Sequence, residues 1–123
     1  TSGVPITLAG LDVTTMVKYN ANRRLALLMR NSPLTDAVCG LYSLWANGNM
    51  DAVPTLFDPV AVAMAINTTF VETRAAHVRV TDEGYTVIDE SETPNCAIGV
   101  RIRTEPFIEW LSGRLLKQNL MRQ

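Results

Sequence analysis

The chain has 123 residues, of which 47% are hydrophobic and 19% are charged, and its net charge is -1 at pH 7. This is the composition of a globular protein with room for one domain. The nearly balanced charge gives no basic excess to attract nucleic acid. The longest apolar run, residues 60–66, is far shorter than the roughly 20 residues that cross a bilayer.

The first elements are a strand and an amphipathic helix. Residues 6–11, I-T-L-A-G-L, form a short apolar run bounded by Pro and Gly, which predicts a buried strand. Residues 20–31 predict a helix that ends at the Asn31-Ser32-Pro33 break. Its expected inner face is Leu25, Leu28 and Met29, with Arg23, Arg24 and Arg30 toward water.

A second helix is predicted to begin at Pro33 or Thr35 and to run to about Ala46, where Asn47-Gly48-Asn49 stops it. Its apolar stripe is Val38, Leu41, Tyr42 and Trp45.

Residues 56–67, L-F-D-P-V-A-V-A-M-A-I-N, combine one acid with an otherwise apolar run. Asp58 before Pro59 is a good helix start, since a carboxylate accepts from free backbone N–H groups and Pro tolerates the first turn. Asn67 is a suitable C-terminal cap. A helix that is apolar on every side belongs in a core, so we expect this one to be covered on all faces.

The second half of the chain changes to strand-like alternation. Residues 76–89 predict a β-hairpin around the turn Asp82-Glu83-Gly84, and residues 96–102 predict a further strand. A final amphipathic helix begins at Thr104 or Glu105. Its expected inner face is Phe107, Ile108, Leu111, Leu115 and Leu116. The pattern predicts an α/β or α+β fold: residues 1–123 form a single domain or the C-terminal segment of a larger α/β domain.

The remaining reactive side chains are interpreted as structural or solvent-exposed. The single histidine, His77, lies on a strand and fits no catalytic constellation, and one His with two distant Cys gives no zinc spacing. Cys39 and Cys96 form no C-x-x-C pair, which favours buried thiols in a reducing compartment and a cytoplasmic protein. The acids around the hairpin are interpreted as solvated.

Asp58 has two compatible interpretations. On sequence chemistry alone a helix cap is favoured over a ligand role. A carboxylate at the head of a buried helix is also rigidly held and partly desolvated, which suits a metal or substrate ligand.

The order of four segments resembles a known family. S-G-V-P-I-T-L-A-G-L-D-V-T, two helices, F-D-P-V-A-V-A-M-A-I and T-R-A-A-H-V-R-V together resemble the C-terminal part of the inosine-uridine-preferring nucleoside hydrolases. The resemblance covers residues 2–116. It implies an open α/β sheet with flanking helices, here including the β-hairpin and the C-terminal helix.

The resemblance also implies a chemistry. Members of the family hydrolyse the N-glycosidic bond of ribonucleosides in purine and pyrimidine salvage. A calcium ion held by aspartates binds the ribose hydroxyls and the attacking water. Asp58 matches a calcium ligand of the family, and Phe57 stands where many members carry a His that protonates the leaving base. Tyr42 and Trp45 lie where aromatic residues contact the nucleobase, although core packing is the favoured role for each.

The family's D-x-D-x-x-x-D-D cluster, which supplies most calcium ligands and the general base, is not in this sequence. The resemblance therefore implies a missing N-terminal half of the fold as the partner of this chain, and a homo-oligomer when the protein is complete. This chain alone is expected to have no catalytic residue and no activity. The alternative is a non-catalytic remnant or interaction module that keeps part of the fold.

Overall fold

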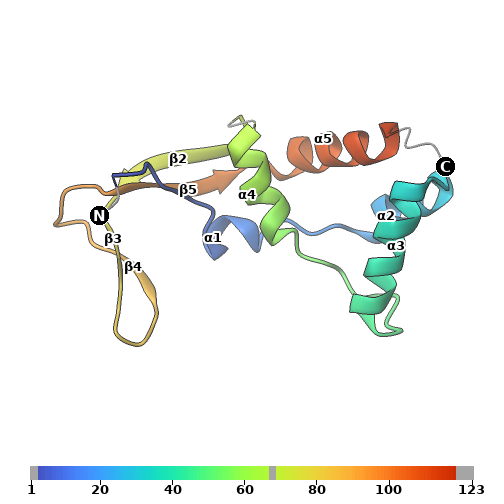
Figure 1. Ribbon diagram of the computed structural model, residues 1–123, viewed down its shortest axis with the longest axis horizontal. Coiled ribbons are helices and arrows are strands. Elements are labelled where there is room, and N and C mark those ends of the chain that lie inside the picture. The colour runs from blue at the N-terminus through green and yellow to red at the C-terminus, as the bar shows by residue number, and fades with distance from the viewer. Residues whose placement is uncertain (1–2, 67–68, 119–123) are drawn as a thin grey trace. The chain divides into compact units, whose positions relative to one another are not determined.

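The structure of the protein is a computed structural model that describes residues 3–66 and 69–118. The chain divides into two compact units, which are described separately. The sheet unit comprises Thr1–Met16 and Phe57–Arg103, and the helical unit comprises Val17–Leu56 and Thr104–Gln123. The predicted mixture of helices and strands is confirmed (Figure 1).

The sheet unit is built on three strands in the order β1-β5-β2. β1 (Thr7–Leu8) is parallel to β5 (Cys96–Ile102), and β5 is antiparallel to β2 (Val71–Ala76). The sheet unit also contains the short helix α1 (Leu11–Thr14) and the helix α4 (Phe57–Ile66).

Gly99 of β5 lies where β1, β2 and α1 approach one another closely. A Cβ atom built there would lie 3.1 Å from Val71 Cγ1, 3.3 Å from Val13 Cγ2 and 3.5 Å from the Leu8 carbonyl oxygen. β1, β2 and α1 therefore converge on one residue of the central strand, and any side chain there would have to displace a core valine.

The predicted strand over residues 6–11 is only partly present. Only Thr7 and Leu8 pair with β5, and the chain then turns into α1. The Gly10 carbonyl accepts hydrogen bonds from the Val13 and Thr14 backbone N–H groups and from the Thr14 hydroxyl. These local bonds favour a helical turn over a longer strand.

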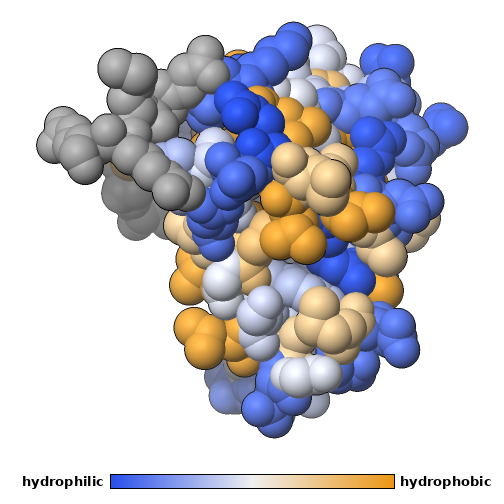
Figure 2. Space-filling view, turned by 90° about the vertical axis from the view of Figure 1, so that its right-hand side faces the viewer, coloured by the Kyte–Doolittle hydropathy of each residue, from blue (hydrophilic) through white to orange (hydrophobic). Residues whose placement is uncertain are grey.

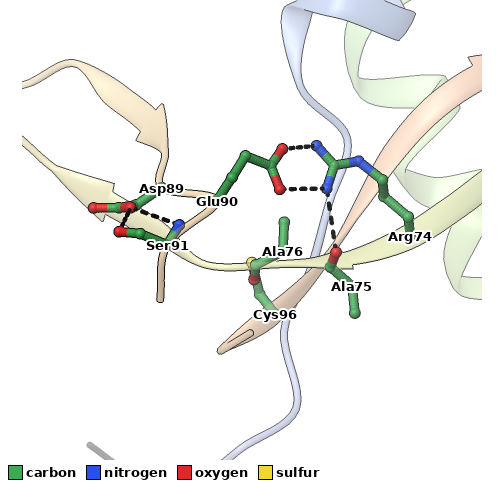
Figure 3. A network of polar contacts seen from close by, with 7 residues as sticks. All are labelled: Arg74, Ala75, Ala76, Asp89, Glu90, Ser91 and Cys96. Atoms are coloured by element: carbon green, nitrogen blue, oxygen red, sulfur yellow. Dashed lines mark hydrogen bonds and ion pairs between the residues drawn. The ribbon is translucent and has the colours of Figure 1, made fainter. Parts of the chain in front are cut away.

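The predicted hairpin is confirmed as β3 (Val78–Val80) paired antiparallel with β4 (Thr86–Ile88). A bidentate ion pair connects the loop after β4 to the three-stranded sheet, because Arg74 Nη2 of β2 lies 2.6 Å from Glu90 Oε1 (Figure 3). The side chain of Asn95 accepts from the Val78 N–H and donates to the Val78 carbonyl. These contacts fix the base of the hairpin.

The helical unit contains α2 (Ala21–Arg30), α3 (Pro33–Ala46) and α5 (Thr104–Lys117), close to the predicted ranges. Ser32 and Thr35 form a reciprocal capping box at the start of α3. Asn31 and Asn47 end α2 and α3 in the left-handed conformation, with φ values of 49° and 46°.

The predicted inner face of α2 is wrong. Leu27 is buried instead, whereas Leu25, Leu28 and Met29 are exposed. Arg24, one turn before Leu27, is half-buried and donates to the carbonyls of Tyr19 and Met50, so the side of the helix with Arg24 and Leu27 faces the rest of the unit.

Of the predicted apolar stripe of α3, Leu41 and Trp45 are exposed and Val38 and Tyr42 are half-buried. On the face drawn in Figure 2, hydrophobic residues reach the molecular surface beside hydrophilic ones. The inner face of α5 is confirmed for Phe107 and Ile108, which are buried, while Leu111, Leu115 and Leu116 are half-buried.

Candidate functional site

Asp58 lies in the first turn of α4 with its side chain exposed. The helix begins at Phe57, two residues before the predicted first helical residue Pro59, so the prediction of Asp58 as the N-cap is wrong: Asp58 lies inside the first turn and Leu56 precedes the helix. A carboxylate there interacts favourably with the positive end of the helix dipole. Within residues 3–66 and 69–118 no hydrogen bond or ion pair engages this carboxylate, which leaves its oxygens available to a ligand.

The described residues cover α4 on one side only, so they do not supply the cover on every face that its apolar sequence calls for. Only Val60 and Ala63 are buried, while Val62 and Ile66 are 60% and 61% exposed. The physical reason is the small amount of structure around α4, which among the described elements of its unit packs mainly on α1. The predicted cap Asn67 lies outside the described residues.

Phe57 precedes Asp58 on the same helical turn and is 43% exposed. Its ring presents no atom that can donate a proton, so no general acid stands beside the carboxylate at this position. The structure thus brings together two of the four predicted site residues, Phe57 and Asp58.

Tyr42 and Trp45 belong to α3 in the helical unit, where they form a ring pair with centroids 6.1 Å apart. The Tyr42 hydroxyl donates to the carbonyls of Met50 and Ala52 at 3.0 and 2.9 Å. The Arg24 guanidinium carbon lies 4.6 Å from the centre of the Tyr42 ring. Through these contacts Tyr42 holds the segment that follows α3 in place.

Trp45 differs from Tyr42 because it is 59% exposed. The packing role favoured for it by the sequence is not fulfilled by the described part of this chain. A large exposed indole is available for contact with another molecule or another part of a fold.

His77, Cys39 and Cys96, which the sequence predicts to be structural, show no arrangement typical of a catalytic or metal site among the described residues. His77 Nδ1 lies 2.7 Å from the Thr93 carbonyl oxygen. Cys39 and Cys96 are both free thiols and only half-buried, and burial, followed by the nearby Asp36 charge, raises the pKa of Cys39.

Asp89 was interpreted as solvated and is half-buried. Its carboxylate accepts from the Ser91 hydroxyl and from the Ser91 N–H (Figure 3). These hydrogen bonds, the hydroxyl's first, lower the pKa of Asp89. The sequence predicted Arg24 to face water and gave no role to Asn95, because the bonds of Arg24 to Met50 and of Asn95 to Val78 join residues far apart in the chain.

The site does not by itself fit a calcium ion. Calcium takes six to eight oxygen ligands, and no group of three or more His, Cys, Asp or Glu side chains is placed to hold a metal in the described part of the chain. Asp58 can supply one ligand, so further oxygen ligands would have to come from another part of a protein.

The sequence model of the family described as inosine-uridine preferring nucleoside hydrolase matches residues 1–109. The chain belongs to this family. The match includes α4 with Phe57 and Asp58, and α3 with Tyr42 and Trp45. A comparison with curated proteins gives no match.

Solved structures of nucleoside hydrolases share the fold of this family member. A purine-preferring ribonucleoside hydrolase from Gardnerella vaginalis is 23% identical with a TM-score of 0.75. The plant nucleoside hydrolase PpNRh1 is 18% identical with a TM-score of 0.83. An inosine-guanosine nucleoside hydrolase is 20% identical with a TM-score of 0.80.

Each alignment covers 94% of this chain but only 40%, 42% and 40% of the respective solved chain. The chain therefore spans about two-fifths of the length of the structures that it matches. Its elements correspond to a C-terminal portion of the fold, as the sequence predicted. No helix among the described residues is long and apolar enough to cross a membrane.

Proposed function

We propose that this chain is the C-terminal portion of a calcium-dependent nucleoside N-ribohydrolase, which hydrolyses the N-glycosidic bond of ribonucleosides when the fold is complete. The observation that carries the proposal is the exposed Asp58 carboxylate in the first turn of α4, within the region that matches the family. We further propose a cytoplasmic homo-oligomer that acts in nucleoside salvage.

In this proposal Asp58 contributes one oxygen ligand and the preceding portion of the fold contributes the others. Bound calcium would supply a positive charge that orients ribose hydroxyls and favours ionisation of water. The contribution of this chain is positional, since α4 fixes the Asp58 backbone and Pro59 restricts the first turn. One carboxylate alone does not hold calcium usefully, so the 123-residue chain by itself is expected to be inactive.

Phe57 shapes the expected substrate range. General acid catalysis contributes roughly 10²- to 10⁴-fold, and Phe57 cannot provide it to a leaving base. Nucleosides whose base leaves without protonation from this position should therefore be the better substrates.

The test is hydrolysis of inosine and uridine by this chain joined to the preceding portion of the fold. Outer-shell partners of a metal are worth about 10- to 100-fold, so loss of a direct ligand in Asp58→Asn should lower kcat/KM by on the order of 10²-fold or more. Asp82→Asn is the matched control, because Asp82 is an exposed carboxylate in the hairpin turn. Activity of the 123-residue chain alone, or equal effects of the two variants, would contradict the proposal.

A second candidate function is a non-catalytic interaction module that retains part of the fold. Phe57 favours it, since the position next to Asp58 has lost the proton donor that many family members carry. This alternative predicts that the joined protein binds no calcium and that Asp58→Asn changes neither binding nor stability.

A further inference from the structure

The chain enters α4 through residues 50–56, here called the entry segment, which lie outside the helices and strands. Two backbone hydrogen bonds hold the second half of this segment. The Tyr19 N–H donates to the Pro54 carbonyl at 3.0 Å. The Leu56 N–H donates to the Val17 carbonyl at 2.9 Å. Both pairs belong to the helical unit, so this unit fixes the backbone up to the residue that precedes α4.

Arg24 of α2 connects the groups that anchor the entry segment. Its half-buried guanidinium donates to the Tyr19 carbonyl at 2.9 Å and to the Met50 carbonyl at 3.2 Å. The same group lies 4.6 Å from the centre of the Tyr42 ring, whose hydroxyl bonds the carbonyls of Met50 and Ala52. A planar guanidinium can bond two carbonyls and stack on a ring at once, which a lysine ammonium cannot do.

The first turn of α4 depends on the conformation of the entry segment. Leu56 stands immediately before the first helical residue, and a leucine side chain offers no acceptor to the free N–H groups at the start of a helix. The backbone of the entry segment therefore decides where the first turn begins. That turn carries Phe57 and Asp58, the two residues on which the proposed function depends.

We infer that Arg24 is a positioning residue of the proposed site, which acts through the entry segment on the first turn of α4. The inference rests on the proposed function for the role of Asp58, whereas the ordering of the entry segment rests on the hydrogen bonds of Arg24 alone. Misplacement of a functional group by about 1 Å can lower a rate by about 10²-fold. A residue that does not touch the substrate can therefore control turnover.

Amide hydrogen exchange of the 123-residue chain tests the ordering of the entry segment. In Arg24→Lys we expect exchange to become about tenfold faster at Leu56 and at residues 60 and 61, the first amides bonded within α4. Arg30→Lys is the matched control, because Arg30 lies on the same helix and donates to the Leu116 carbonyl of α5 instead. Its exchange at these amides should equal that of the unchanged chain.

Turnover by the chain joined to the preceding portion of the fold tests the connection with the site. Arg24→Lys should lower kcat for inosine by about tenfold, and Arg30→Lys should leave it unchanged. If Arg24 acts through Asp58, Arg24→Lys should lower kcat by less than about twofold once Asp58→Asn is present. A merely structural role would lower kcat by the same factor in both backgrounds.

Equal exchange in Arg24→Lys and Arg30→Lys would overturn the inference, and so would equal losses of kcat with and without Asp58→Asn. Should Arg24→Lys fail to fold by circular dichroism, Tyr42→Phe takes its place. It removes the hydroxyl bonds to the entry segment, and unchanged exchange at Leu56 in this variant would overturn the inference as well. Absence of hydrolysis by the joined protein would contradict the proposed function, while exchange would still decide whether Arg24 orders the entry segment.

Discussion

A buried hydrogen bond in the helical unit gives the most quantitative prediction. The Tyr19 hydroxyl and Ser112 Oγ lie 2.9 Å apart, and both residues are 5% exposed. Tyr19→Phe removes one hydroxyl and leaves the other buried without its partner, which costs about 1–3 kcal/mol. A loss of about 1.5 kcal/mol, with an m-value of about 1.5 kcal/mol per M, lowers the urea midpoint by about 1 M.

The assay is urea unfolding followed by tryptophan fluorescence, which reports on the half-buried Trp110 of α5 and on Trp45 of α3, both in the helical unit. Ser112→Ala should cost a similar amount, and the double variant should cost less than the sum of the two by about 1 kcal/mol. Tyr85→Phe is the control, since Tyr85 is 70% exposed, and it should leave the midpoint unchanged. Strict additivity of Tyr19→Phe and Ser112→Ala would refute the reasoning.

Three further predictions concern other parts of the chain. Ser91→Ala should raise the pKa of Asp89 toward its ordinary value, as measured by NMR titration. The hydrogen bonds from Ser91 lower the pKa of Asp89 in the folded protein. The stabilisation that they give is therefore present above the unfolded pKa and is lost as the pH falls through the folded pKa. An unchanged titration of Asp89 would contradict this. Ser32→Ala should cost about 1 kcal/mol in the unfolding free energy by removing the cap of α3, and an unchanged urea midpoint would be inconsistent with the capping box. Phe57→His in the joined protein should raise purine nucleoside turnover by about 10²-fold or more, and equal gains for purine and pyrimidine nucleosides would argue against a proton donor at this position.

Local signals in the sequence predicted the bounds of α2, α3 and α5 well, but not the length of β1 or the start of α4. The Asn20 cap, the Ser32-Pro33 start and the left-handed Asn31 and Asn47 ends depend on bonds between neighbours in the chain, so they can be recognised without a structure. The hairpin follows from alternation around Gly84, whose φ of 87° favours glycine.

Packing was predicted less well, because it depends on which elements are available to cover a face. The periodicity of α2 pointed to Leu25, Leu28 and Met29, yet Arg24 takes the inner position through bonds to distant carbonyls. For α4 the sequence indicated a helix covered on all faces, whereas this chain covers only the side of Val60 and Ala63.

The candidate site was predicted in part. The joint order of four segments, one of them the segment with Asp58, indicated the family, and the match over residues 1–109 confirms it. The metal role of Asp58 and the substrate role of Tyr42 and Trp45 stay predictions. For Tyr42 the contacts with Arg24 and with two backbone carbonyls could not be inferred from sequence, since they join residues of α2, α3 and the following loop.

Calcium binding measured by titration calorimetry tests the central claim most directly. The account predicts no binding to the 123-residue chain alone, because Asp58 is one carboxylate without companions. It predicts one calcium ion per chain once the preceding portion of the fold is joined to it, with affinity strongly reduced by Asp58→Asn and unaffected by Asp82→Asn. Tight calcium binding by the chain alone, or binding to the joined protein that does not depend on Asp58, would contradict the account.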